Sequence, residues 1–436
     1  MNRIDNQHKF DSFRERFSVF TFENQSVVRE NGMLKLAFEF NLDDQYRFRP
    51  TLEIPARPFF DWENISIELL EALAFQIGMT ELVSYWKIAC PKRVVVKPFA
   101  LTEQQISFWK KLYYNGLGEF LYLNSISVSE ADLMQIEFVG NRDFVKVDVP
   151  LEERTLVPIG GGKDSVVTLE CLRREMPVIP LIVNPRGATL NCVKMADYKE
   201  NDFIVINRTL DPTMLKLNSE GYLNGHTPFS ALLAFISVLV AFGSRSRYIA
   251  LSNENSANES TVPGTKINHQ YSKSIEFERD FRSYVIENLN DKVQYFSFLR
   301  PLSELQIASL FSKCEAYHSV FRSCNAGSKT DSWCGQCPKC LFTWIILSPF
   351  LSREKLTAIF GKDLMADASL RPILEELNGT AAVKPFECVG TKEEVQACEE
   401  AIRGNRMLVN EILHRFNDDH FLPEKFEQIL KSHLHV

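Results

Sequence analysis

The sequence has no excess of positive charge. Its 436 residues include 49 lysines and arginines against 56 aspartates and glutamates, which gives a formal net charge of −7. Nucleic-acid partners are recruited largely by a basic field, and the composition as a whole supplies none. We therefore expect a small-molecule substrate and no nucleic-acid partner, with a local basic patch as the remaining alternative.

Targeting segments and long hydrophobic runs are also scarce. The N-terminal stretch MNRIDNQHKFDSFRERF lacks the apolar run of a secretory signal, so we expect a cytoplasmic chain. One apolar segment, PFSALLAFISVLVAFG at residues 228–243, could suggest a membrane. It is shorter than the ~20 residues that a span needs, so we expect a buried core helix and no membrane association. The sequence does not indicate the oligomeric state.

Internal repeats, low-complexity tracts and long linkers are absent as well. The chain is too long for one ordinary core, and its patterns change twice. Residues 1–150 mix strand-like segments such as MLKLAFEFNL with helix-like ones, which predicts an α+β domain with substrate recognition as its candidate role. Residues 151–348 alternate apolar strands, among them DFIVINR, with helices, which predicts an α/β fold with a parallel sheet. Residues 349–436 read as a helical C-terminal region.

A glycine-rich loop, PIGGGKDSVVTLE, joins the first of these strands to a helix. Such a loop lets backbone N–H groups approach an anion at the helix N-terminus. The Walker pattern and the dinucleotide pattern G-x-G-x-x-G are both absent. The expected phosphate ligands are Gly160, Gly161, Gly162, Lys163, Asp164 and Ser165. The alternative is a glycine turn without a ligand.

The loop resembles the pyrophosphate loop S-G-G-x-D-S of the N-type ATP pyrophosphatases (the PP-loop superfamily), with Gly160 where that family usually has serine. The resemblance implies that ATP is cut between its α- and β-phosphates, with Mg²⁺ offsetting the charge of the leaving pyrophosphate. The departure at Gly160 removes one hydroxyl donor but keeps the backbone donors. Lys163 is also a candidate for stabilising charge at the α-phosphate.

Four cysteines cluster in SCNAGSKTDSWCGQCPKC. A chain without an export signal favours metal binding or burial over disulfides. Two C-x-x-C steps share one cysteine, so a single tetrahedral metal could take all four thiolates. The nitrile-forming deazaguanine synthases of the same superfamily carry a similar structural zinc. The expected Zn²⁺ ligands are Cys324, Cys334, Cys337 and Cys340; free thiols are the alternative.

Polar side chains follow a further apolar segment. Ligands of open α/β sheets bind beyond the carboxyl ends of the strands, and SNENSANES follows one such strand. Its oxygen-bearing side chains suit a hard cation, so Asn253 and Glu254 are expected to bind Mg²⁺ or substrate, as are Asn258 and Glu259. A capped polar loop is the alternative.

Candidates for proton transfer are fewer. In the string NHQYSKS, His269 is the first choice, with a structural histidine as the alternative. His226 could contact the nucleotide or cap the following helix. Cys192 and Cys388 could act as acid/base thiols, with an inert buried thiol as the favoured alternative for each.

Several of these strings occur together and in one order: GGGKDSVVTLE, SNENSANES, NHQYSKSIEFERDF, WCGQCPKC and KPFECVG. This combination resembles the MurL-type UDP-N-acetylmuramoyl-L-alanyl-L-glutamate epimerases of peptidoglycan synthesis, over most of the chain. The resemblance implies ATP-dependent inversion of the terminal L-glutamate to D-glutamate through an acyl adenylate, with release of AMP and pyrophosphate. The alternatives are another adenylating enzyme, such as an amide- or nitrile-forming or tRNA-thiolating one, and a nucleotide-binding regulator.

Overall fold

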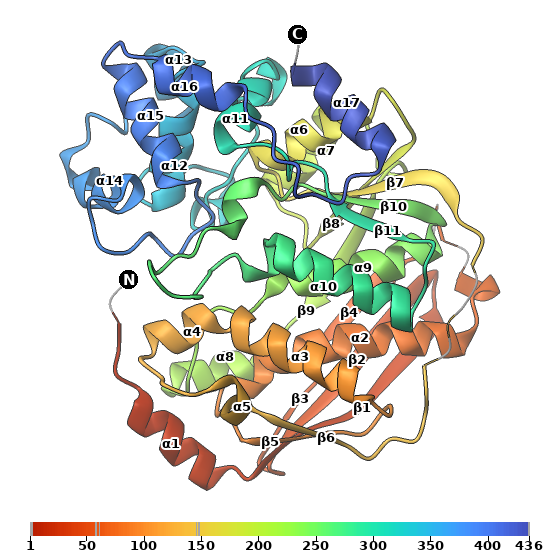
Figure 1. The fold of residues 1–436 in the computed structure, drawn as a ribbon. Helices are drawn as coiled ribbons and strands as arrows, with labels where there is room; N and C mark the ends of the chain where they lie inside the picture. Colours follow the sequence, from red (N-terminus) through yellow and green to blue (C-terminus); the bar gives the residue numbers. More distant parts are fainter. Residues whose placement is uncertain (1–2, 57–58, 61, 145, 147–148, 435–436) are drawn as a thin grey trace. The chain divides into compact units, whose positions relative to one another are not determined.

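The computed structural model describes residues 3–56, 59–60, 62–144, 146 and 149–434. Contacts within the chain divide it into two compact units. Unit 1 comprises residues 1–152, 205–247 and 279–294, and unit 2 comprises residues 153–204, 248–278 and 295–436. Each unit is thus assembled from segments that lie far apart in the sequence (Figure 1).

Unit 1 is built on a mixed sheet in the order β9-β4-β2-β1-β5-β6, with β3 beside β2. Antiparallel pairing joins β2 to β1, β3 and β4, and it joins β4 to β9, whereas β5 runs parallel to β1 and β6. The segment DFIVINR forms β9 and therefore pairs with an N-terminal strand. The strands are Val19–Glu30 (β1), Met33–Leu42 (β2), Tyr46–Phe48 (β3), Thr51–Pro55 (β4), Arg93–Val96 (β5), Gln135–Phe138 (β6) and Ile204–Thr209 (β9).

Local sequence patterns account for much of unit 1. Strand β2 alternates buried and half-buried side chains, as its period of two predicts. Helix α3 begins after Thr102, whose hydroxyl and Gln105 form the reciprocal cap. The helices are Gln7–Arg16 (α1), Ile67–Trp86 (α2), Glu103–Gly116 (α3), Gly118–Leu123 (α4), Glu130–Leu133 (α5), Pro212–Ser219 (α8) and Phe229–Gly243 (α9). Helix α10 (Ile275–Asn288) belongs to unit 1 from residue 279 onward.

The apolar segment at residues 228–243 forms helix α9, which contacts α2 and is buried along most of its length. The prediction of a core helix is therefore confirmed. None of the helices in the described ranges is both long enough and apolar enough to cross a membrane.

Unit 2 carries the predicted strand–loop–helix pattern. Its sheet has the order β11-β10-β7-β8, and β7 and β8 are parallel, with Thr155 opposite Val178. The strands are Glu152–Pro158 (β7), Val178–Val183 (β8), Ser246–Leu251 (β10) and Gln294–Ser297 (β11). The first helices are Lys163–Leu172 (α6), Gly187–Met195 (α7) and Glu304–Ser312 (α11), and α11 packs on α6.

The rest of unit 2 is helical. The helices are Pro338–Leu347 (α12), Arg353–Phe360 (α13), Arg371–Asn378 (α14), Lys392–Ile402 (α15), Met407–Leu413 (α16) and Glu424–Leu434 (α17). Helix α15 contacts α12, α14 and α16 (Figure 1), α12 also contacts α14, and α11 contacts α12 and α16. The α/β class with a helical C-terminal region is thus confirmed.

Candidate functional site

The glycine loop of unit 2 runs from the end of β7 to the start of α6, where Gly162 is the N-cap. Gly161 has a φ of +80°, and a Cβ there would lie 2.9 Å from the backbone nitrogen of Thr189. A Cβ on Gly162 would lie 2.9 Å from Ser323 Oγ, whereas one on Gly160 would meet nothing within 4 Å. The shape of the loop thus requires glycine at the second position, where φ is positive and the close contact is with backbone. The third position meets a serine hydroxyl that can rotate away, and the first position is open.

This difference provides a matched pair of variants. Gly161→Ala should lower the free energy of unfolding by about 1–3 kcal/mol, because the alanine is held at positive φ against α7. Gly160→Ala should change it by less than about 0.5 kcal/mol. Urea unfolding of both variants measures the effect, and equal stabilities would contradict the described loop geometry.

Lys163 is buried and points into a set of carboxylates. Its ammonium pairs with Asp164 and with Glu304 at the start of α11. Burial alone would lower the pKa of Lys163, but these two carboxylates raise it above its ordinary value. Lys163 therefore balances buried negative charge, a role that the sequence did not suggest for it.

Two of the surrounding acids have pKa values above the ordinary range for glutamate. Burial, and next the charge of Asp164, raise the pKa of Glu254, and burial raises the pKa of Glu304 well above its ordinary value despite Lys163. Glu254 also caps the short helix Asn255–Asn258 through the N–H of Ala257, at 3.2 Å. Any added cation near Asp164, Glu254 and Glu304 would relieve their mutual repulsion.

The other predicted residues of this strand end make structural contacts. Asn253 Nδ2 donates to Ser297 Oγ at 3.0 Å, and Asn258 Oδ1 accepts from the N–H of Ile275 at 2.8 Å. Glu259 pairs with Lys384 of the C-terminal region. Of the four candidates, Glu254 is therefore the one whose carboxylate interacts with the charge of Asp164 in the glycine loop.

Arg300 is a central residue that the sequence analysis missed. It is fully buried and donates to the carbonyl oxygen of Glu254 at 2.6 Å, to that of Lys273, and to the Glu278 carboxylate at 3.2 Å. It therefore ties the SNENSANES and NHQYSKS loops together. A signal existed, because an arginine stands inside the otherwise apolar segment FSFLRPL.

The C-terminal string KPFECVG folds back onto these loops. The N–H of Lys384 donates to the carbonyl of Thr261 at 3.3 Å, and its ammonium donates to the carbonyl of Gly390 at 2.9 Å. Cys388 is thereby brought 3.1 Å (Sγ to Nζ) from Lys273 and within hydrogen-bonding contact of the His269 side chain.

The two candidate acid/base thiols, Cys192 and Cys388, have different surroundings, which shift their pKa values in opposite directions. Cys192 is fully buried beneath the glycine loop, with its Sγ 3.8 Å from the carbonyl oxygen of Gly161, and burial raises its pKa to about 12. Burial would also raise the pKa of Cys388, but Lys273, Lys339 and His269 outweigh it and hold that pKa well below its ordinary value. The surroundings therefore favour the neutral thiol at Cys192 and the thiolate at Cys388.

The clustered cysteines lie close enough to share one metal ion. Sγ–Sγ distances are 3.6 Å from Cys334 to Cys340, 3.6 Å from Cys337 to Cys324 and 3.5 Å from Cys337 to Cys340. Tetrahedral coordination with metal–sulfur bonds of about 2.3 Å separates the sulfurs by about 3.8 Å. The residues therefore fit a closed four-thiolate site.

His226 is held in unit 1. Its Nδ1 lies 3.6 Å from a carboxylate oxygen of the buried Glu119, upstream of α9. This contact gives the residue a local electrostatic partner.

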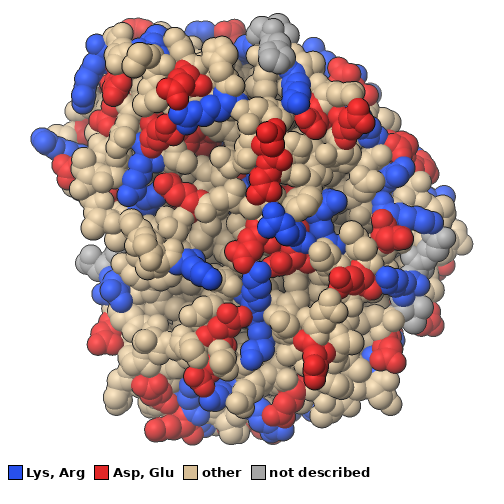
Figure 2. Space-filling model, viewed as in Figure 1, with Lys and Arg blue, Asp and Glu red and all other residues tan. Residues whose placement is uncertain are grey.

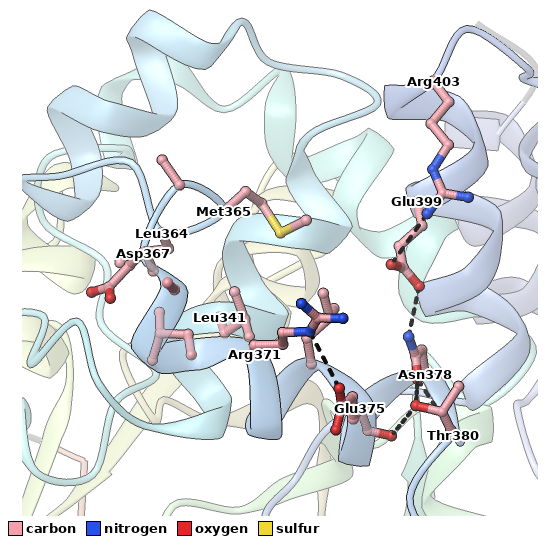
Figure 3. A pocket seen from close by; sticks show the side chains of 14 residues that line it. Leu341, Leu364, Met365, Asp367, Arg371, Glu375, Asn378, Thr380, Glu399 and Arg403 are labelled. Carbon is pink, nitrogen blue, oxygen red and sulfur yellow. Dashed lines mark hydrogen bonds and ion pairs between the residues drawn. The ribbon is translucent and has the colours of Figure 1, made fainter.

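A cavity of about 690 Å³ lies elsewhere in unit 2, among α12, α14 and α15 (Figure 3). Its charged residues already have partners: Arg371 lies 3.4 Å from Glu375, and Glu399 accepts from Asn378 at 3.0 Å. None of the predicted site residues lines it.

On the face shown in Figure 2, basic and acidic side chains are interspersed.

Comparison with known proteins extends over most of the chain. The family model "MurL N-terminal domain" matches residues 11–298, and "MurL C-terminal domain" matches residues 319–421. No solved structure gives a significant match.

Three curated relatives carry the name UDP-N-acetyl-alpha-D-muramoyl-L-alanyl-L-glutamate epimerase. The proteins from Micromonospora sp. and Salinispora tropica are each 36% identical, over 87% of this chain and 85% and 83% of their own lengths. The protein from Xanthomonas oryzae pv. oryzae is 32% identical over 87% of this chain and 85% of its own. The family resemblance inferred from the motifs is therefore confirmed, and the chain belongs to the MurL family.

Proposed function

We propose that this chain inverts the Cα centre of the terminal L-glutamate of UDP-MurNAc-L-Ala-L-Glu at the expense of ATP, in the cytoplasm. The names of its relatives support the substrate and the inversion. The observation that carries the use of ATP is the meeting of buried charges at the glycine loop, where Lys163 pairs with Asp164 and Glu304 and the charge of Asp164 reaches Glu254. This arrangement suits a polyphosphate bound with its metal ion.

Inversion requires removal of the Cα proton. Beside an ionised carboxylate that proton is hardly acidic, because the resulting carbanion would place two negative charges together. Transfer of AMP to the carboxylate gives a neutral mixed anhydride, whose carbonyl can take up the developing charge. A base then removes the proton, an acid returns one to the opposite face, and hydrolysis leaves the D-glutamyl product, AMP and pyrophosphate.

The residues are assigned as follows. The backbone of Gly160–Gly162 and the Ser165 hydroxyl hold the pyrophosphate, and Asp164, Asn253 and Glu254 provide oxygens for Mg²⁺. When bound, that ion offsets phosphate charge. Lys163 keeps the acids around it in place and stabilises charge at the α-phosphate, and His269 transfers protons near Cα.

The test is incubation with ATP, Mg²⁺ and UDP-MurNAc-L-Ala-L-Glu in D₂O. We expect AMP release, the D-glutamyl product and deuterium at its Cα. Release of AMP with neither inversion nor deuterium would instead support another adenylating reaction. Inversion without AMP release would overturn the role of ATP.

We also propose that the cysteine cluster holds a structural Zn²⁺. Cys337→Ser should lower the bound zinc, measured by elemental analysis, and should lower the melting temperature, because a closed four-thiolate site contributes directly to folding. Cys314→Ser, at a half-buried cysteine outside the cluster, is the control and should leave the zinc content unchanged. A zinc-free wild-type protein with the same melting temperature would contradict the proposal.

A further inference from the structure

Cys388 belongs to a cluster of charged side chains that the proposed adenylation does not use. Lys273 lies 3.1 Å from its sulfur, and His269 hydrogen-bonds to it. Lys339 adds a second positive charge, although Lys339 also lies 3.6 Å from the Glu387 carboxylate. These groups come from three separate segments of unit 2, so the surroundings of the thiol are built by the fold.

The cluster adjoins the proposed ATP site. The ammonium of Lys273 that contacts the thiol also feels the charges of Glu254 and Asp164. Arg300 holds the carbonyls of Lys273 and Glu254 together. Lys273 thus links Cys388, which it contacts, to the carboxylates assigned to magnesium, whose charge reaches it. We infer that a newly formed acyl adenylate lies near these carboxylates.

The chemistry of the cluster favours a nucleophile over a base. Despite burial, Lys273, Lys339 and His269 keep the pKa of Cys388 well below its ordinary value. A base for proton abstraction works best when its pKa lies near the working pH. A thiolate kept ionised by neighbouring cations is instead an activated nucleophile and a good leaving group.

We propose that Cys388 takes the glutamyl acyl group from AMP, so that the Cα proton is lost from an enzyme-bound thioester. The sulfur bonds to the acyl carbon while the bond from that carbon to the phosphate oxygen breaks, and AMP leaves with the electron pair. Once the thiolate charge has been consumed, His269 loses its proton to water. The neutral imidazole then takes the Cα proton, and the electron pair moves toward the thioester carbonyl. A second acid group of the protein returns a proton to the opposite face, and water hydrolyses the thioester and regenerates the thiolate.

Thioester formation has an electrostatic advantage. In the acyl adenylate, a negatively charged phosphate stands beside the carbonyl that must accept the enolate charge. Transfer to sulfur removes that phosphate and consumes the negative charge of the thiolate. The cation of Lys273, until then paired with sulfur, then faces the enolate.

This inference rests on the proposed function, and the test separates the two. Wild-type protein is mixed with ATP, Mg²⁺ and UDP-MurNAc-L-Ala-L-Glu, quenched in acid within the first turnover, and mapped by mass spectrometry. We expect an acyl adduct on the Cys388 peptide that hydroxylamine removes. AMP release with inversion but without this adduct would overturn the thioester and leave the proposed function intact, whereas absence of AMP would overturn the adenylation itself.

A variant provides the second readout. Cys388→Ala with hydroxylamine present should still consume ATP and should yield the glutamyl hydroxamate of L configuration, with no deuterium from D₂O. Inversion or deuterium incorporation by Cys388→Ala would overturn the proposal. Cys314→Ala, which removes a half-buried thiol whose pKa burial raises to about 11, should behave as wild type.

Lys273 is assigned as a positioning residue for the thiolate. A depressed pKa keeps the thiolate populated to lower pH, so iodoacetamide should alkylate Cys388 at about pH 6, well below the usual thiol pKa of about 8.5. Lys273→Met should raise that pKa, so the alkylation rate should fall at least tenfold at pH 6 and recover at alkaline pH. An unchanged pH profile would remove Lys273 from this role.

Discussion

Lys163→Met is expected to destabilise the folded protein by about 3–5 kcal/mol and to abolish AMP release. The side chains of Lys163 and Glu304 are only 4% and 5% exposed, so the variant leaves a buried carboxylate without its cation. Urea unfolding measures the first effect, and AMP release with ATP and the muramoyl dipeptide measures the second.

A double variant separates these two effects. Lys163→Met with Glu304→Leu removes both members of the buried pair, so most of the lost stability should return. Asp164 is 35% exposed and can be solvated. We expect the double variant to fold but to release no AMP, and Glu304→Gln alone to retain AMP release. A double variant with wild-type AMP release would show that Lys163 only balances the charge of Glu304.

Arg300→Met should also cost about 3–5 kcal/mol. The guanidinium is fully buried, and its loss leaves Glu278, whose side chain is 2% exposed, without its cation. The variant also removes the donors to the carbonyls of Glu254 and Lys273, so both loops should loosen. We expect a lower urea midpoint together with loss of epimerisation.

Arg403→Met is the matched control. Arg403 lies 3.9 Å from Glu399, but its side chain is 77% exposed, and exposed ion pairs contribute about 0–1 kcal/mol. If Arg300→Met and Arg403→Met had equal free energies of unfolding, the claim that the buried Arg300 stabilises the fold more than an exposed arginine would be wrong.

Features that depend on neighbouring residues could be predicted from the sequence. The alternation of β2, the cap at Thr102 and the glycine loop before α6 are each set within about ten residues. The four-cysteine cluster is similarly local, because its ligands lie within one short segment. Such patterns determine the elements and the ligand sets.

Features that depend on distant residues could not be predicted. Lys163 and Glu304 are 141 residues apart, and Lys273 and Cys388 are 115 apart. The antiparallel pairing of β9 with β4 is another long-range contact. The local pattern of apolar and polar residues does not indicate which distant residue a side chain will contact. Neither the ion pair of Lys163 nor the cations around Cys388 could therefore be deduced from sequence alone.

Activation of the glutamyl carboxylate can be followed by the fate of its oxygen. UDP-MurNAc-L-Ala-L-Glu labelled with ¹⁸O at both oxygens of the α-carboxylate of glutamate is incubated with the enzyme, ATP and Mg²⁺, and AMP is isolated for mass spectrometry. Adenylation predicts one ¹⁸O atom in the phosphate of each AMP released, with or without a later thioester. Formation of the D-glutamyl product with unlabelled AMP would show that the carboxylate never bonded to the α-phosphate and would contradict the proposed mechanism.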